Sequence, residues 1–287
     1  MKSVKTWYYH HLTQLRRIMQ SAMLVVLIAL PLLNKAGVHW LSGTLYSLRT
    51  GPVPIADPAM ALQTFLLNRA IISELLIAVL LPAVLALALG RVFCSWLCPF
   101  DLLAAGLLKF RKPQNRNGDG PRNRNPRARK YWLVFAALLL LIVISGVPLV
   151  VFLSMPGLIS SQISDALFWG VIGIEASLIP AALLLEFFSG RRIWCKYICP
   201  VGAALALFRS PLTLKVDFQK QRCTCSPNHL PCNVACPLHL DPRRAGIYPY
   251  CYNCGDCINR CMGEGRALSF SFTSKDVNQK SYARSLV

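Results

Sequence analysis

Long apolar stretches alternate along the chain with short polar and basic segments. Four of these stretches approach the roughly 20 residues that a helix needs to cross the hydrocarbon core of a bilayer, and they cover about 18–33, 71–93, 131–153 and 167–188. Each contains one proline, which a membrane helix tolerates where neighbouring helices or waters satisfy the freed carbonyl groups. The pattern therefore predicts an α-helical integral membrane protein with four transmembrane helices.

The amino-acid composition agrees with this prediction. The 287 residues are 54% hydrophobic and only 15% charged, whereas a soluble domain has about 25% charged residues. The first stretch follows several basic residues, as the apolar part of a secretory signal would, but Lys35-Ala36-Gly37 is a poor cleavage site. We therefore expect the first stretch to remain in the protein as a membrane anchor.

Basic residues predict the orientation of the chain. The segment 109–130 carries nine Lys and Arg residues against one acidic residue, and the segment between the third and fourth stretches carries none. By the positive-inside rule, both termini and this central loop face the cytoplasm, which makes the chain a multi-pass protein of the bacterial inner membrane. The net charge of +19 then reflects topology and nearby anionic lipid, and we expect no nucleic-acid partner.

A cysteine motif occurs twice, at the predicted cytoplasmic ends of the second and fourth stretches. RVFCSWLCP (91–99) and RIWCKYICP (192–200) match position by position at a constant offset of 101. We call 94–99 corner one and 195–200 corner two. The duplication predicts that the membrane domain is built of two parallel repeats, related by an axis along the membrane normal.

The corner cysteines are candidates for a metal or redox site. Within each corner the two cysteines are four residues apart, so one helical turn would place both thiols on one face, and the proline that follows should end the helix. Two corners that meet would present four thiolates, enough for one iron or an iron–sulfur centre. The alternative is a pair of helix ends with inert, buried cysteines. The four residues are Cys94, Cys98, Cys195 and Cys199.

The C-terminal segment carries the most specific motif, Cys-x2-Cys-x2-Cys-x3-Cys at 251–261. Three closely spaced thiolates bind three irons of a cubane, and the fourth cysteine typically reaches a second cluster. A structural zinc site would favour two separated Cys-x2-Cys pairs. The spacing therefore predicts a bacterial ferredoxin-like module at 211–287, which follows a membrane domain at 1–210.

Eight cysteines in this module suggest two [4Fe–4S] clusters with exchanged fourth ligands. The upstream group, at 223–236, ends like a ferredoxin half but begins with an irregular Cys-x-Cys. It could therefore hold a different cluster, zinc or nothing. We assign cluster one to Cys236, Cys251, Cys254 and Cys257, and cluster two to Cys223, Cys225, Cys232 and Cys261.

Other cofactors have no support in the sequence. None of the five histidines lies inside an apolar stretch, and there is no Cys-x2-Cys-His motif, so we expect no haem. The chain also lacks a glycine-rich phosphate loop, so we expect no nucleotide. Among the carboxylates, Glu175 is the deepest in a predicted span and is a candidate proton acceptor for a quinol, although a helix–helix hydrogen bond would explain it equally well. Glu74, Glu186 and Asp101 should lie near the membrane interfaces.

The duplicated corners, the four apolar stretches and the cysteine-rich module resemble the NapH/MauN group of ferredoxin-type membrane proteins, to which the C-terminal part of NosR and CcoG are related. The resemblance runs from about Arg16 to Phe270. It implies a quinol dehydrogenase component that draws on the membrane quinone pool. Electrons would pass from quinol through the clusters to a ferredoxin-type or cytochrome partner, in a periplasmic nitrate reductase or methylamine-utilisation system.

Two other functions are compatible with the same ligands. The protein could be a maturation or regulatory factor that supplies electrons for the assembly of another redox enzyme. It could also be a transporter with a metal-sensing C-terminal module, although few polar groups lie within the four stretches.

Overall fold

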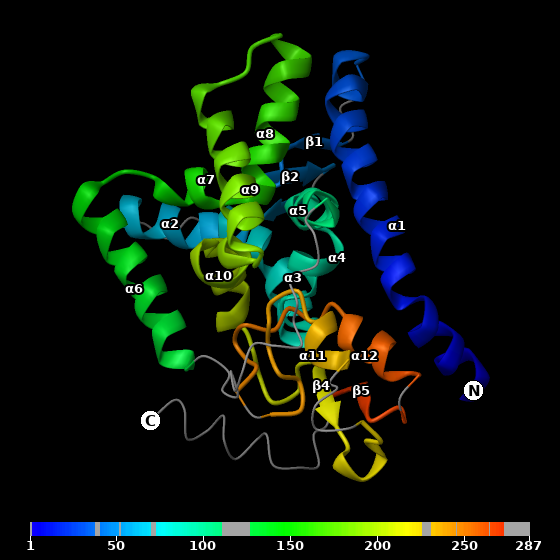
Figure 1. Cartoon of the computed structure of the whole chain (residues 1–287). Coiled ribbons are helices and arrows are strands. Elements are labelled where there is room, and N and C mark those ends of the chain that lie inside the picture. The colour runs from blue at the N-terminus through cyan, green and yellow to red at the C-terminus, as the bar shows by residue number, and fades with distance from the viewer. Residues whose placement is uncertain are drawn as a thin grey trace.

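The computed structural model describes residues 2–37, 41–51, 53–69, 73–110, 127–225, 231–244, 246–263 and 265–272 (Figure 1). The fold is mostly helical, with two small antiparallel sheets. The helices before residue 210 are α1 (Lys2–Lys35), α2 (Pro58–Asn68), α3 (Ser73–Leu89), α4 (Val92–Trp96), α5 (Pro99–Lys109), α6 (Ala128–Ser145), α7 (Leu149–Leu153), α8 (Met155–Phe168), the 3-10 turn η1 (Ile174–Ser177), α9 (Leu178–Ser189), the π-helical turn η2 (Trp194–Ile198) and α10 (Pro200–Leu207).

Two helices in the described part of the chain are long and apolar enough to cross a membrane. They are the part of α1 at Tyr9–Lys35 and the whole of α6, while α3 is apolar but shorter. The first predicted span lies inside α1, which begins well before it. The second corresponds to α3, which ends at Leu89 because Gly90 turns the chain with φ +73°.

The third and fourth predicted spans are not continuous helices. In the third, α6 ends at Gly146, which has φ +66°, and α7 begins only after Pro148. In the fourth, α8 ends at Phe168, and a turn and η1 precede α9. With 12 residues, α9 rises only about 18 Å. Glycines interrupt both stretches because they allow positive φ values at no steric cost.

A three-stranded sheet fills a segment for which the sequence pattern predicted no element. It consists of β1 (Leu41–Gly43), β2 (Ser47–Thr50) and β3 (Val53–Ala56), paired antiparallel in that order. Tyr46 anchors the sheet to the helices, since its hydroxyl donates to the carbonyl of Val151. The sheet and α2 connect the first two apolar helices, α1 and α3.

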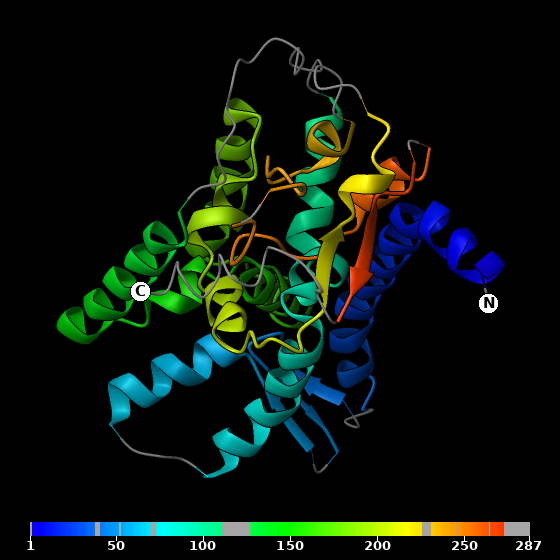
Figure 2. The same cartoon turned by 90° about the horizontal axis from the view of Figure 1, so that it is seen from below.

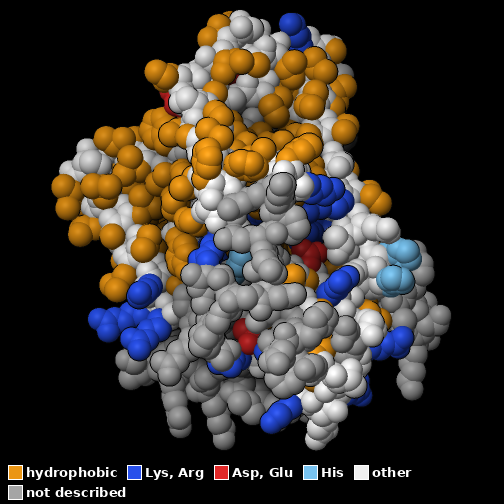
Figure 3. Space-filling view, in the orientation of Figure 1, with side chains coloured by type: hydrophobic (Ala, Val, Ile, Leu, Met, Phe, Trp, Pro, Cys, Tyr) orange, Lys and Arg blue, Asp and Glu red, His pale blue; other side chains and the backbone are white. Residues whose placement is uncertain are grey.

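Apolar side chains remain exposed on the helices before residue 210. Large hydrophobic residues are exposed along α1, α3, α6 and α9 and in the connection between α8 and α9. Figure 3 shows them over the upper part of the molecule and the arm formed by α6, while Lys and Arg lie mainly at the lower end. An exposed apolar surface of this extent is typical of contact with lipid or protein rather than water.

The C-terminal module contains a two-stranded sheet and two short helices. Strand β4 (Lys215–Phe218) pairs antiparallel with β5 (Leu268–Ser271), with Lys215 opposite Ser271. The 3-10 turn η3 (Lys220–Arg222) follows β4, and α11 (Pro231–Ala235) packs against α12 (Asp256–Cys261). Figure 2 shows this module beside the N-terminal half of α1.

One hydrophobic core joins the module to helices that precede residue 210. It contains residues of α1, α6 and α10 together with α11, α12 and both strands of the module. Tyr250, for example, is fully buried and packs against Tyr131 at the start of α6, with 5.1 Å between the ring centroids. The starts of α1 and α6 and the module therefore lie at the same end of the molecule (Figure 1).

Candidate iron–sulfur site

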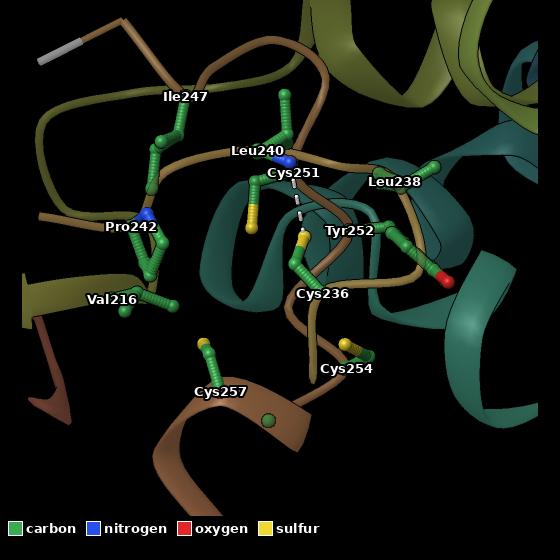
Figure 4. A pocket seen from close by; sticks show the side chains of 11 residues that line it. Val216, Cys236, Leu238, Leu240, Pro242, Ile247, Cys251, Tyr252, Cys254 and Cys257 are labelled. Carbon is green, nitrogen blue, oxygen red and sulfur yellow. Dashed lines mark hydrogen bonds between the residues drawn. The ribbon is translucent and has the colours of Figure 1, made fainter. Parts of the chain in front are cut away.

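Four cysteines of the module line one pocket. They are Cys236, Cys251, Cys254 and Cys257, the same four residues that the spacing assigns to cluster one. Figure 4 shows their sulfur atoms turned toward a common space, with one cysteine from the segment after α11, two from the loop before α12 and one from α12 itself. Most of the remaining wall is apolar and is formed by Val216, Leu238, Leu240, Pro242 and Ile247.

Burial disfavours the charged thiolate form of these cysteines. Burial raises the pKa of Cys236 to about 12 and the pKa of Cys257 well above its usual value. Thiolates in such a pocket are stable only when coordinated metal or hydrogen bonds offset their charge. The backbone N–H of Leu240 donates to Sγ of Cys236 over 3.4 Å, as an N–H donor does toward a cluster ligand.

The kind of metal group that these cysteines could bind is a separate question. Among the described residues, no three His, Cys, Asp or Glu side chains lie close enough together to hold one metal ion. A cubane binds each thiolate through a different iron, so its ligands are farther apart than those around a single zinc ion. The four cysteines of the pocket match the number of thiolates that a [4Fe–4S] cluster needs.

Asn253 holds the pocket loop in place. It is buried and adopts φ +54°, a left-handed conformation that asparagine tolerates better than most residues. Its amide Nδ2 donates to the carbonyls of Leu89 (3.0 Å) and Leu214 (2.9 Å), and its Oδ1 accepts from the hydroxyl of Tyr248 (2.9 Å). Asn253 thus ties the ligand loop to the end of α3. The sequence analysis missed this residue, and its position beside Cys254 was the only signal.

Corner one also contacts the ligand loop directly. The hydroxyl of Ser95 donates to the carbonyl of Tyr252 over 2.7 Å. Arg91, three residues before corner one, also contacts this loop, since its guanidinium donates to the carbonyl of Pro249 over 2.8 Å. From corner two, Nζ of Lys196 donates to the carbonyl of Leu238 over 2.9 Å. Both corners therefore support the walls of the four-cysteine pocket.

The corner prolines begin helices rather than only ending them. Cys98 and Cys199 have nearly the same backbone conformation, φ −69° and ψ 119° against φ −63° and ψ 116°, and each is the N-cap of the next helix. Pro99 and Pro200 are the first residues of α5 and α10, a position that suits proline because its missing N–H has no helical partner there. The two thiols of one corner therefore do not share one continuous helix.

Each of two apolar clusters includes or contacts one cysteine from each corner. Cys94 and Cys199 pack against one apolar cluster, and Cys98 and Cys195 belong to another. Cys94 and Cys195 also pack against the core that contains the four-cysteine pocket. Cysteines of both corners therefore contribute to the same apolar clusters, and a shared metal or redox site on them stays a prediction.

Two buried arginines cross between the halves. Arg91 donates to the carbonyl of Cys195 over 3.2 Å, and a Cβ at Gly202 would overlap its guanidinium. Arg192 donates to the carbonyl of Asp101 over 3.1 Å and lies 3.5 Å from its carboxylate. Asp101 and Gly202 are equivalent at the offset of 101, so each arginine contacts the same point of the opposite half.

The four carboxylates singled out from the sequence lie in different surroundings. Glu175 lies in η1, in the connection between α8 and α9, which is at the opposite end of the molecule from α11 and α12 (Figure 1). Glu186 and Asp101 are buried rather than solvated, and both pair with Arg192, at 3.3 Å for Glu186. Glu74 is exposed at the start of α3, and its position at a membrane interface stays a prediction.

The second predicted ligand set is partly assembled. Cys232 and Cys261 are buried in the same core, and Cys223 packs against it. Burial raises the pKa of Cys232 to about 11. Cys225 is the last described residue before a gap in the described chain, which resumes at residue 231. Three of the four residues therefore lie in or against one core, and a cluster on this set stays a prediction.

Known proteins share the sequence of this chain over most of its length. A family described as "4Fe-4S binding domain" matches residues 72–117 and 172–218, and each matched segment contains one corner. The chain is 29% identical to the methylamine utilization ferredoxin-type protein MauN of Methylorubrum extorquens over 88% of this chain and 75% of that protein. It is 28% identical to the ferredoxin-type protein NapH of Escherichia coli over 93% of this chain and 92% of that protein.

No solved structure matches the chain. The family match and the relatives support an iron–sulfur electron-transfer protein, and the apolar helices agree with a membrane location. The chain is a homologue of the ferredoxin-type proteins named NapH and MauN, and it carries a 4Fe–4S binding domain.

Proposed function

We propose that the protein is a membrane-bound quinol dehydrogenase component. It takes electrons from quinol at the corner end of the membrane domain and passes them through [4Fe–4S] clusters to a redox partner. The partner is a ferredoxin-type protein or a cytochrome, in a methylamine-utilisation or nitrate-reducing system, as the names of MauN and of the NapH group suggest. The observation that carries this proposal is the four-cysteine pocket, which is supported by both corners.

The position of the pocket supports electron entry from the membrane. Its ligand loop is held by the end of α3 and by corner one, and α3 exposes apolar side chains such as Leu76 and Leu80. A quinol that approaches from lipid along α3 would reach the corners before it reached water. A bound [4Fe–4S] cluster supplies one-electron transfer, and the chain's own residues hold the quinol and take up its protons.

Buried carboxylates beside corner two are our candidates for the proton acceptor. Quinol oxidation releases two protons with its two electrons, so a base must lie near the site. Glu186 and Asp101 flank the single guanidinium of Arg192, and Oε1 of Glu186 is buried without a protein partner. Glu186 is therefore a better candidate than Glu175, which lies far from the pocket.

The membrane arrangement that we propose keeps the four spans and the two repeats that the sequence pattern predicts. The apolar segments in α1, α3, α6 with α7, and η1 with α9 form four spans in two parallel repeats, and the corners lie at their cytoplasmic ends. The module lies at the same end of the molecule as the starts of α1 and α6. This arrangement supports one cytoplasmic face for the N-terminus, the central loop and the module.

A second [4Fe–4S] cluster on Cys223, Cys225, Cys232 and Cys261 completes the electron path in this proposal. The common core of Cys223, Cys232 and Cys261 supports it. The pocket cluster then accepts electrons at the corners, and the second cluster delivers them to the partner.

The test is metal analysis and EPR of the full chain, purified anaerobically in mild detergent. We expect about eight irons and eight sulfides per chain, and a reduced-cluster signal after addition of a menaquinol analogue. C257S should remove about four irons, and C232S should remove the other four. Because the two substitutions are chemically identical, each serves as the control for the other.

Other results would change the proposal in defined ways. About four irons in the unaltered protein would mean that the irregular half does not hold a cubane. Zinc without sulfide would contradict electron transfer altogether. Clusters that accept no electrons from quinol, combined with failed assembly of a redox enzyme in cells that lack this protein, would instead favour the maturation factor.

A further inference from the structure

The N-terminal half of α1 packs directly on the loop that carries two of the pocket cysteines. Gly255, between Cys254 and α12, has φ +82°, and a Cβ there would overlap the side chain of Leu12. The next residue, Asp256, accepts hydrogen bonds from Thr13 (3.0 Å) and Arg16 (2.9 Å). A membrane helix therefore contacts the ligand loop at consecutive residues.

Arg16 is an unusual member of this contact because its charge is enclosed. The side chain is only 3% exposed, and its single carboxylate contact is Asp256, on the Nη2 nitrogen, in the described part of the chain. Its Nε and Nη1 are buried and have no hydrogen-bond partner among the described residues. In the other buried arginines of the described chain, Arg91 and Arg192, only Nε lacks a hydrogen-bond partner among the described residues.

The direction of the charge effect follows from elementary electrostatics. A cubane bound by four thiolates is an anion, and reduction adds one more negative charge. A buried cation nearby stabilises the reduced state more than the oxidised state, because the interior screens charge less than water does. Cys254 lies close enough to Arg16 for their charges to interact.

We propose that Arg16 is a positioning residue that raises the reduction potential of the pocket cluster. This inference rests on the proposed function, since it requires a cluster on Cys236, Cys251, Cys254 and Cys257. The N–H groups of Arg16 that have no partner among the described residues and its position over the ligand loop provide the means, and the carboxylate of Asp256 partly offsets its charge. Through Arg16, α1 therefore influences the reduction potential at which the module accepts an electron.

The test is an EPR-monitored redox titration of the holoprotein. R16Q should lower the equilibrium constant for reducing one cluster by on the order of tenfold, which is ~59 mV for a one-electron couple. R16K, which keeps the charge, should stay close to the unaltered protein. The matched control is R260Q, because Arg260 lies on α12 in the same module but is exposed, so water and salt screen its charge.

An opposite shift provides a check that a purely structural role would not give. D256N removes the negative charge beside Arg16, so it should raise the potential of the same cluster. If R16Q loses its cluster, D256N and R16K decide, and a D256N potential at or below that of the unaltered protein overturns the inference. An unchanged potential in R16Q with an intact cluster also overturns it, and then the proposed function stands. If the unaltered protein contains no cluster, the proposed function itself fails.

Discussion

Glu186, Asp101 and Arg192 form the most consequential group of buried charges outside the pocket. Two carboxylates share one guanidinium in a site where all three side chains are at most 4% exposed. Asp101 also accepts a hydrogen bond from the side chain of Gln20 in α1, over 2.8 Å. Buried charges persist only when they are paired or functional, and here one carboxylate is in excess of the cations.

Substitution of Glu186 tests its role as the proton acceptor. E186Q keeps the shape of the side chain but cannot take up a proton at this position. We expect quinol-dependent cluster reduction to slow by about 10²-fold, the usual contribution of a positioned base. Cluster reduction by dithionite should not change. Stopped-flow absorbance of the anaerobic protein measures both rates.

The matched control for this experiment is E175Q. Glu175 lies in η1, at the opposite end of the molecule from α11 and α12, so its substitution should leave the quinol-dependent rate unchanged. A slow E175Q with a normal E186Q would return the proton site to the position that the sequence pattern favoured.

At the scale of elements, the contact between α1 and the start of α12 depends on one glycine. Position 255 requires glycine for two reasons. Its φ is positive, and Leu12 occupies the space that a side chain would fill. The short loop from Cys251 to Gly255 thereby fits between α1 and corner one. Close approach of this kind fixes the pocket loop without any additional ligand.

Replacement of this glycine should therefore destabilise the ligand loop. G255A introduces backbone strain worth about 1–3 kcal/mol and a clash with Leu12. We expect a lower thermal midpoint in detergent and reduced iron content, both measured on anaerobic protein. The double substitution G255A/L12A should recover part of the loss, because it removes the clash and leaves the strain.

Gly263 offers the control for this substitution. It lies just after α12, and a Cβ there would meet nothing within 4 Å. G263A should therefore keep both iron content and thermal midpoint. Equal losses in the two variants would show that the tight contact with α1 is not the cause.

At the scale of the whole molecule, charge and apolar surface separate along the long axis. Exposed hydrophobic residues cover the part away from the module, and Lys and Arg gather at the module end (Figure 3). The start of α1 lies at the module end, while Lys35, at its other end, lies near the end of α8, since its Nζ donates to the carbonyl of Leu167. This polarity fits insertion in one direction.

Reporter fusions test that direction. Alkaline phosphatase is active only after export, so a fusion after Gly37 should be active and a fusion after Lys109 should be inactive. A green fluorescent protein fused at the same positions should give the reverse pattern. Activity of the phosphatase at Lys109 would contradict a cytoplasmic module.

The local sequence predicted which four cysteines line one pocket, and their role as cluster ligands stays a prediction. The spacing of 251–261 predicted three of the pocket cysteines. The expected exchange of fourth ligands predicted Cys236, which the structure places in the same pocket. The helical spans were predicted less well, because the glycines at 146 and 170, where the helices break, lie within or beside apolar stretches that otherwise look continuous. An apolar run shows where lipid or core can be contacted, but the conformation of single glycines decides where a helix ends.

The apolar character of the helices, the duplicated corners and the cysteine ligands could all be read from the chain alone, because composition, repetition and spacing are local properties. The groups that meet across long separations became known only from the folded protein: Arg16 with Asp256, and Arg192 with Asp101. Burial and pairing of these groups depend on packing between segments up to 240 residues apart. No local pattern distinguishes a buried arginine from a solvated one before those segments come together.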